Sequence, residues 1–126
     1  MAGLTLDSGA LIAFERSDRR VIAHLKEAAR RGTELTVPTV VVAEAWRGGS
    51  RSARVARLLG ASTIEPLSER LARAAGEAIA TTKGAGVIDA IVMASAAQRL
   101  DRVLTSDLDD LEKLGAAFPG VRVIGL

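Results

Sequence analysis

The sequence predicts a single α/β domain, residues 1–126, with a central parallel sheet of about five short strands flanked by helices on both faces. Short β-like runs alternate with longer segments of helical periodicity along the whole chain. The length of 126 residues suits one domain with its own core. The hydrophobic share of 48% argues against disorder over most of that length.

The expected strands comprise residues 4–6, 34–37, 63–65, 102–105 and 121–124. The expected helices comprise residues 8–14, 19–31, 39–46, 51–59, 68–82, 88–100 and 108–114. The three valines at 40–42 favour a strand by side-chain type. We nevertheless expect a helix there, because Pro38 ends the preceding strand and Thr39 can cap a helix that begins after it.

Composition excludes several classes of protein. The chain has no cysteine, so it has no disulfide framework, zinc–thiolate site or cysteine nucleophile. No apolar run approaches the roughly 18 residues that a membrane-spanning helix needs. The first residues lack a basic leader and include Asp7 where a signal peptide is apolar. We therefore expect a cytoplasmic protein that does not insert into a membrane.

Three carboxylates lie among apolar neighbours, whereas most acids of the chain lie near arginine or lysine. Asp7 follows the first expected strand, Glu44 lies in VPTVVVAEAW, and Asp89 lies in GVIDAIVMASA. Burying an isolated carboxylate costs several kcal/mol unless it is paired or neutralised. A helix cap for Asp7 and buried ion pairs for Glu44 and Asp89 are the structural alternatives to a functional role.

A fourth acid, Asp107, follows the fourth expected strand in VLTSDLDDLEKL. Glu44 and Asp89 are expected near the starts of helices, so all four acids should meet at the carboxyl edge of the sheet, where such folds bind ligands. Two carboxylates about 4 Å apart repel by roughly 4 kcal/mol at an effective dielectric constant near 20. The cluster should therefore raise pKa values or bind a cation, and oxygen ligands without His or Cys select Mg²⁺ or Mn²⁺.

The acids immediately after Asp107 divide into two groups. Asp109 is a candidate fifth metal ligand. Asp110 and Glu112 are interpreted as complements to the positive end of the helix they begin.

These residues resemble the PIN-domain ribonucleases, and among them the VapC-type toxins of type II toxin–antitoxin pairs. The similarity runs almost end to end, through LDSGAL, VVVAEAW, IDAIVMASA and LTSDLD in that order. One departure is that Asp110 stands where the family often has an aromatic residue.

The resemblance implies that Asp7, Glu44, Asp89 and Asp107 are the catalytic acidic quartet and, with Asp109, the metal ligands. It implies that Ser8 and Thr105 are polar neighbours of the metal. It further implies a Mg²⁺- or Mn²⁺-dependent endoribonuclease that leaves 5′-phosphate and 3′-hydroxyl ends. The implied partners are an RNA substrate, a cognate antitoxin that inserts a basic residue into the acidic pocket, and a second copy of the chain, with a larger assembly on the antitoxin.

The basic residues are mostly arginine, 14 against 3 lysines, and arginine's planar fork suits phosphate. Four of them recur at spacings of four, three and three and could form one helical stripe that contacts RNA or the antitoxin: Arg47, Arg51, Arg54 and Arg57. The alternative for the stripe is a solvated face. With only three aromatic residues, extensive base stacking is not expected.

Two other functions would use a similar set of acids. A PIN nuclease of RNA processing would share the site but not the antitoxin. A Mg²⁺-binding phospho-receiver module also gathers acids at a sheet edge, but it needs an acidic pair near the first strand, where this chain offers Asp7 alone.

Overall fold

The computed structural model describes residues 2–126 and contains one five-stranded sheet in which every pairing is parallel. The strands are β1 (Leu4–Leu6), β2 (Leu35–Pro38), β3 (Thr63–Glu65), β4 (Arg102–Thr105) and β5 (Arg122–Gly125). The helices are α1 (Ser8–Glu15), α2 (Arg19–Arg31), α3 (Thr39–Ala45), α4 (Ala53–Gly60), α5 (Glu69–Thr81), α6 (Val87–Arg99) and α7 (Leu108–Glu112). The predicted fold class is confirmed, and the element bounds differ from the expected ones by one or two residues in most cases.

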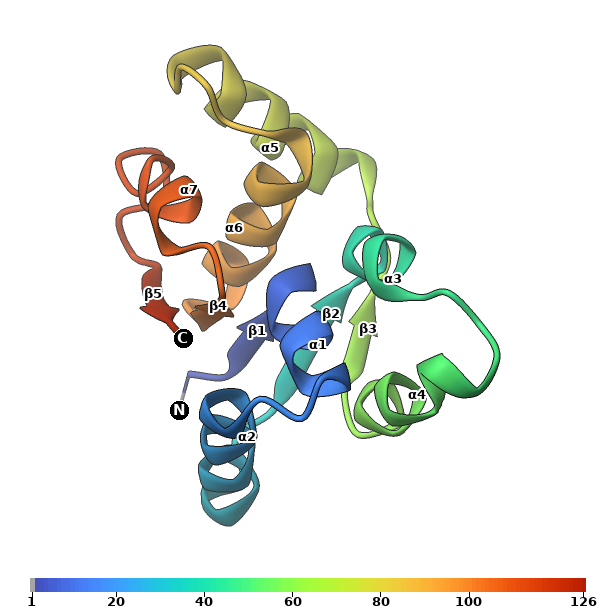
Figure 1. Cartoon of the computed structure of the whole chain (residues 1–126). Helices are drawn as coiled ribbons and strands as arrows, with labels where there is room; N and C mark the ends of the chain where they lie inside the picture. The colour runs from blue at the N-terminus through green and yellow to red at the C-terminus, as the bar shows by residue number, and fades with distance from the viewer. Residues whose placement is uncertain (1) are drawn as a thin grey trace.

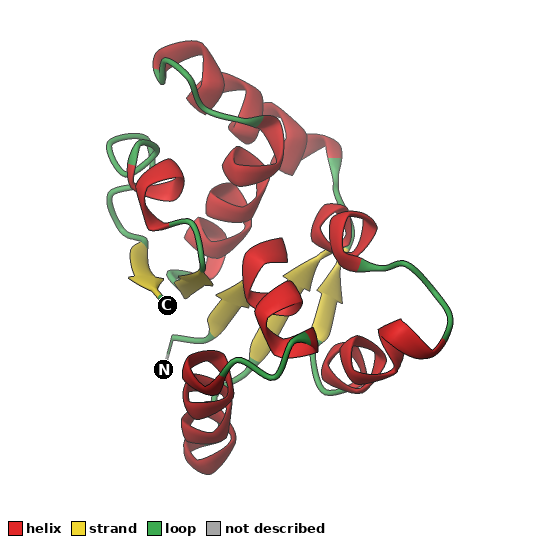
Figure 2. Ribbon diagram, in the orientation of Figure 1, coloured by secondary structure: helices red, strands yellow, loops and turns green. Residues whose placement is uncertain are grey.

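The order of the strands in the sheet is β3-β2-β1-β4-β5. After β1, the chain adds β2 and then β3 on one side of it. The chain then passes through α5 and α6 and forms β4 on the other side of β1. The strands form a central layer with helices packed around them (Figures 1 and 2). The reversal between β1 and β4 is the topological switch point, beside which open α/β sheets bind their ligands at the carboxyl edge.

The valine-rich segment is helical, as expected, but the expected cap is wrong. Pro38 is the N-cap residue of α3, and Thr39 is its first helical residue. The Thr39 hydroxyl instead accepts a hydrogen bond of 3.3 Å from the Leu67 backbone N–H. Val41 is fully buried in the core, so tertiary packing of one helical face outweighs the strand preference of valine.

The expected helix at 51–59 is also different in detail. A short 3₁₀ turn, η1 (Ser50–Ser52), precedes α4. Gly48 and Gly49 both have positive φ, at 77° and 66°, in the segment before it. That backbone suits glycine and breaks any continuous helix between α3 and α4.

The core is formed by aliphatic side chains from both sheet faces, with Leu6, Leu11, Met93 and Leu104 fully buried. Small residues of α6 pack closely against the sheet, and Ala90, Val92 and Ala96 are fully buried. No helix in residues 2–126 combines the length and the apolar character needed to cross a bilayer.

A partly buried ion-pair network connects α6 to the sheet and was not expected. Asp101 has arginine on both sides in the sequence, which suggests a solvated acid, yet it is only 2% exposed. It accepts hydrogen bonds of 2.9 Å from the Gly3 N–H and from the Thr5 hydroxyl, and it pairs with Arg99 Nε at 2.9 Å. Arg99 also donates to Glu65 at 3.0 Å. The network satisfies polar groups where α6 meets β4, a structural role.

Candidate active site at the carboxyl edge of the sheet

Asp7 occupies the turn between β1 and α1 and is 5% exposed. It is the N-cap residue of α1, and its Oδ1 accepts a hydrogen bond of 2.8 Å from the Ala10 N–H. Its Oδ2 accepts a short hydrogen bond from the Thr105 hydroxyl. Burial raises the pKa of Asp7 to about 6, against the lowering effect of these two hydrogen bonds, and the charges of Asp89 and Asp107 raise it further. Asp7 therefore caps α1, as the structural alternative predicted, but its two hydrogen bonds do not remove the negative charge of the carboxylate.

Thr105 joins the two strands at the switch point. It ends β4, is fully buried, and donates its hydroxyl proton to Asp7. The same oxygen accepts a hydrogen bond of 2.8 Å from the Asp107 N–H. Ser8, the other predicted polar neighbour, begins α1 and is half-buried, and no side-chain hydrogen bond involves it in the described part of the chain.

The turn after β4 can approach the first turn of α1 closely because residue 9 is glycine. Sequence reasoning did not single out Gly9. A Cβ placed on Gly9 would lie 2.0 Å from the Ser106 Oγ and 3.1 Å from its Cβ. Glycine therefore allows the turn after β4 to pack against the first turn of α1. Gly9 is part of the LDSGAL motif, but the sequence does not indicate that it contacts Ser106.

Asp89 lies in the first turn of α6 and is half-buried. Burial raises its pKa first, followed by the negative charges of Asp110, Asp107 and Glu44, while Lys113 lowers it. The position near the helix N-terminus favours a carboxylate. These mutual effects indicate that acids from α3, α6 and α7 converge in one electrostatic site.

The start of α7 contributes a pair of acids, and its second member is not the one expected. Asp107 shares a hydrogen bond with Asp110, which is the largest cause of its raised pKa, ahead of burial and the charges of Asp110 and Asp109. The pKa of Asp110 is lowered by its hydrogen bonds to Asp107 and to Lys113, whose Nζ lies 3.2 Å from Oδ1. Residues three apart share a helix face, so Asp110 is directed to Asp107 and Asp109 is more exposed.

Glu44 is less buried and placed differently than its sequence context suggested. It lies in the last turn of α3, not near its start, and it is exposed. The whole helix has only seven residues, so Glu44 remains close enough to influence Asp89. It lines a cavity of about 150 Å³ together with Ile12, Glu15, Arg16, Ala45, Arg47 and Arg51.

The four predicted arginines do not form one helical stripe, because the glycines before η1 interrupt the helix. Arg47 lies in the loop after α3 and donates to the Trp46 carbonyl at 2.8 Å. Arg51 is in η1, with Nε 3.9 Å from Oε1 of Glu15. Arg54, on α4, donates to Ser17 Oγ at 2.6 Å and stacks over Phe14 at 5.4 Å. Arg57 lines a second cavity with Arg54 and Phe14.

The donor set suits a hard divalent cation. Every candidate ligand is a carboxylate or hydroxyl oxygen, which favours Mg²⁺ or Mn²⁺ over softer metals. Within residues 2–126, no three His, Cys, Asp or Glu side chains already lie close enough together to enclose an ion. The pKa values of Asp7, Asp89 and Asp107 are all raised, by burial first for Asp7 and Asp89 and by the hydrogen bond to Asp110 first for Asp107, with neighbouring acids contributing to each. A cation would relieve the repulsion among these acids.

Comparison with solved structures gives neighbours along almost the whole chain. The VapBC2 complex of Rickettsia felis, bound to a DNA fragment from its promoter, has a TM-score of 0.78 at 12% identity, covering 98% of both chains. FitAB bound to an IR36 DNA fragment has a TM-score of 0.67 at 19% identity, covering 97% of this chain and 94% of that one. FitAcB from Neisseria gonorrhoeae has a TM-score of 0.66 at 21% identity, covering 97% and 96%. At these identities the likeness establishes the fold.

The comparison with curated proteins found no match. The family model for the PIN domain matches residues 4–117, which include the four acids and the strands that position them. The chain therefore belongs to the PIN domain family, whose members are nucleases.

Proposed function

We propose that the protein is a Mg²⁺- or Mn²⁺-dependent endoribonuclease that acts in the cytoplasm as the toxin of a toxin–antitoxin pair. One observation carries the proposal: uncompensated carboxylates gather at the switch point between β1 and β4, where Asp7 and Asp107 are linked through Thr105. A nuclease needs such a site, because phosphodiester hydrolysis develops charge that a divalent cation can stabilise.

The proposed metal ligands are the acids of this edge. Asp7, Asp89 and Asp107 would form the centre, Glu44 would approach from α3, and Asp110 is better placed than Asp109 to extend the set. When bound, Mg²⁺ or Mn²⁺ would lower the pKa of a coordinated water and polarise the scissile phosphate. Addition of the water oxygen to phosphorus and departure of the 3′ oxygen would leave 5′-phosphate and 3′-hydroxyl ends.

The protein's own groups have separable tasks in this scheme. Thr105 holds the Asp7 carboxylate in one orientation and fixes the turn that carries Asp107. Glu44 and Asp107 are the two exposed members of the quartet and are the candidates for orienting the attacking water.

Arginines beside Glu44 offer a path for the RNA backbone. Arg16, Arg47 and Arg51 share a cavity with Glu44, and Arg54 lines the adjoining side of α1. Guanidinium groups bind phosphate by paired hydrogen bonds. RNA bound along these arginines would reach the acidic centre with part of its phosphate charge neutralised by them.

The toxin assignment also implies partners. The solved neighbours VapBC2 and FitAB are complexes bound to DNA. For this chain we propose a cognate antitoxin that inserts a basic residue among the acids, together with a homodimer that joins a larger assembly on the antitoxin. Arg47, Arg51 and Arg54 are alternative contacts for that antitoxin.

A second candidate is a PIN nuclease of RNA processing, because the acidic centre would be the same in both cases. Co-purification of the chain with the product of an adjacent small gene would favour the toxin. The phospho-receiver alternative lacks support, since the chain belongs to the PIN family.

The test is cleavage of total cellular RNA by purified protein with Mg²⁺, with Mn²⁺ and with EDTA. Discrete cuts are expected with metal, and their loss is expected in Asp7→Asn and Asp89→Asn. Glu77→Gln is the matched control, because Glu77 is an exposed acid of α5 that contributes to none of the raised pKa values.

Binding of Mn²⁺, measured by calorimetry or electron paramagnetic resonance, gives a readout independent of the RNA chosen. Both Asp→Asn variants should bind Mn²⁺ more weakly while the Glu77→Gln variant binds it normally. Metal affinity unchanged in the two Asp→Asn variants would refute the metal centre even if no substrate had been found.

A further inference from the structure

A small pocket lies at the amino edge of the sheet, at the opposite ends of the strands from the acids. It has a volume of about 160 Å³ and is lined by Leu4, His24, Glu27, Ala28, Arg31, Thr33, Arg102 and Ile124. Leu4 and Arg102 begin β1 and β4, whereas Asp7 and Asp107 follow the other ends of these strands. The pocket is therefore separate from the candidate active site.

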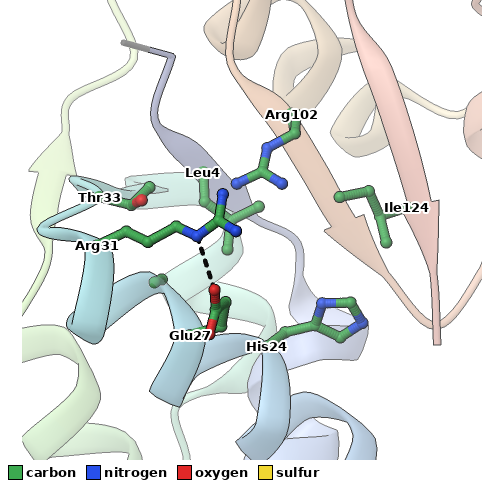
Figure 3. A pocket seen from close by; sticks show the side chains of 8 residues that line it. Leu4, His24, Glu27, Arg31, Thr33, Arg102 and Ile124 are labelled. Carbon is green, nitrogen blue, oxygen red and sulfur yellow. Dashed lines mark hydrogen bonds and ion pairs between the residues drawn. The ribbon is translucent and has the colours of Figure 1, made fainter.

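Cationic side chains converge on this pocket. Figure 3 shows the guanidinium groups of Arg31 and Arg102 directed toward one another across it, with Glu27 below and the His24 ring directed toward Ile124. Arg102 is half-buried. Glu27 reduces the repulsion between the Arg31 and Arg102 guanidinium groups, because its Oε1 lies 2.6 Å from Arg31 Nε. A bound anion would reduce this repulsion further.

A third arginine extends the same charge. Arg102 pairs in register with Arg122 on β5, so the two side chains lie side by side on one sheet face. Arg122 and Ile124 are two residues apart and share that face, so Arg122 is near the pocket although it does not line it. Like charges on adjacent strands destabilise a sheet.

The acids near this edge neutralise these arginines only in part, because Glu27 shares one negative charge between Arg30 and Arg31. Glu27 pairs with Arg31 through Nε at 2.6 Å, and it also holds Arg30 at 2.6 Å. Asp101, next to Arg102 in sequence, lies among Thr5 and Arg99 on the other side. In residues 2–126, the ion pairs do not reach Arg102 or Arg122.

Arg30 and Arg31 have an ordinary structural role, because cations stabilise the C-terminal end of a helix and these two end α2. That explanation does not extend to Arg102 and Arg122, which are strand residues. Their charge, without an ion pair in residues 2–126 and beside an apolar floor of Leu4, Ala28 and Ile124, is the feature that favours an anionic ligand.

We propose that this pocket binds a phosphoryl anion between the guanidinium groups of Arg31 and Arg102. The volume of about 160 Å³ is below the roughly 300 Å³ at which pockets for drug-sized ligands begin, so it suits a phosphoryl group and not a whole nucleotide. The paired N–H donors of arginine match phosphate oxygens. The phosphoryl group is either free phosphate or part of an RNA strand that crosses this edge.

His24 makes the test direct, because it is the single histidine of the chain and lines the pocket. Its ring-proton resonances would be followed by NMR while inorganic phosphate is added at constant pH in EDTA, with sodium chloride of equal ionic strength as the control. A saturable shift with phosphate alone is expected. No shift up to about 20 mM phosphate, or the same shift with chloride, would overturn the proposal.

Variants locate the effect. Arg102→Gln should weaken phosphate binding at least about tenfold, because a charge-assisted bidentate contact is lost. Arg122→Gln should weaken it less and provides a second variant if Arg102→Gln does not fold. Arg19→Gln is the matched control, since Arg19 is exposed at the other end of α2 and does not line the pocket. Equal affinity in Arg102→Gln and wild type would overturn the proposal.

A pentanucleotide RNA without terminal phosphate, added in EDTA to the Asp89→Asn protein, distinguishes the two sources of the anion. A His24 shift with inorganic phosphate and not with this RNA assigns the pocket to a free phosphoryl ligand. A shift with both assigns it to the RNA backbone. Neither result depends on cleavage, so failure of the nuclease proposal and failure of this one are separately visible.

Discussion

Replacing Asp7 by asparagine should make the metal-free protein more stable at neutral pH, even though it removes a residue proposed to be essential. Asp7 has a pKa of about 6 in the folded protein against an ordinary value of 3.8. Each pKa unit corresponds to about 1.4 kcal/mol, so ionised Asp7 costs the folded state about 3 kcal/mol at pH 8. Asparagine cannot ionise, and it caps helices as well as aspartate does.

The loss of a hydrogen bond offsets part of this gain in stability. Asp7 accepts hydrogen bonds from the Ala10 N–H and from the Thr105 hydroxyl, and the asparagine side chain has only one acceptor oxygen. The Thr105 oxygen already accepts from Asp107. Losing one buried hydrogen bond costs about 1 kcal/mol, so a net stabilisation of about 1–2 kcal/mol is expected at pH 8.

The pH dependence has a definite sign. Because the folded pKa of Asp7 is raised, the folded state binds the proton more tightly than the unfolded chain. The resulting stability is fully present below about pH 4 and is lost as pH rises through 6. The advantage of the Asp7→Asn variant should therefore appear between these values and be absent at pH 4.

The assay is urea denaturation of wild type and variant in EDTA at pH 4 and pH 8, repeated at pH 8 with Mg²⁺. Asp18→Asn is the control, because Asp18 also caps a helix but has its pKa lowered to about 2 by Arg20. That substitution should not stabilise the protein at pH 8. Magnesium should stabilise wild type and leave the Asp7→Asn variant nearly unchanged. An Asp7→Asn protein no more stable than wild type at pH 8 in EDTA would refute this reasoning.

Three further substitutions test other parts of the structure. Asp110→Asn should lower Mg²⁺ affinity by calorimetry more than Asp109→Asn does, because Asp110 contacts Asp107; the reverse order would restore Asp109 as the fifth ligand. Asp101→Ala should lower the free energy of unfolding, measured by urea denaturation, by about 3 kcal/mol, since it leaves buried donors unpaired. A much smaller loss would mean that water replaces the carboxylate. Gly9→Ala should weaken Mg²⁺ binding and cost about 1–3 kcal/mol by overpacking, and unchanged values of both would show that Ser106 simply moves aside.

The site was predictable where the chemistry depends on strand ends. A carboxylate within two residues of the end of a short buried strand lies at the carboxyl edge whatever the strand order, and this applies to Asp7 and Asp107. The strand order itself could not be predicted from local pattern. That order makes β1 and β4 neighbours and brings Thr105 to Asp7.

Burial was less predictable than position. Glu44 has apolar neighbours in sequence but is exposed, because the seven-residue α3 buries only Val41 and Ala45 and leaves another side to solvent. Asp101 has charged neighbours on both sides yet is buried, because one of them, Arg99, turns inward with it. Sequence neighbours indicate which residues are near in the chain, whereas burial depends on which helix face the tertiary fold covers.

The fold separates part of the charge that composition presents as balanced, although Glu34 and Asp101 also lie at the amino edge, directly before β2 and β4. The net charge is only +2, yet acids collect where β1 and β4 end and arginines collect where β4 and β5 begin. In a parallel sheet every strand starts at one edge and ends at the other, so short polar signals at strand starts and strand ends are sorted to opposite edges. Like charges that gather at one edge repel one another in the ligand-free protein. A bound ion of opposite charge relieves that repulsion. The same argument therefore predicts a cation at the carboxyl edge and an anion at the amino edge, and the two ligands can be tested independently.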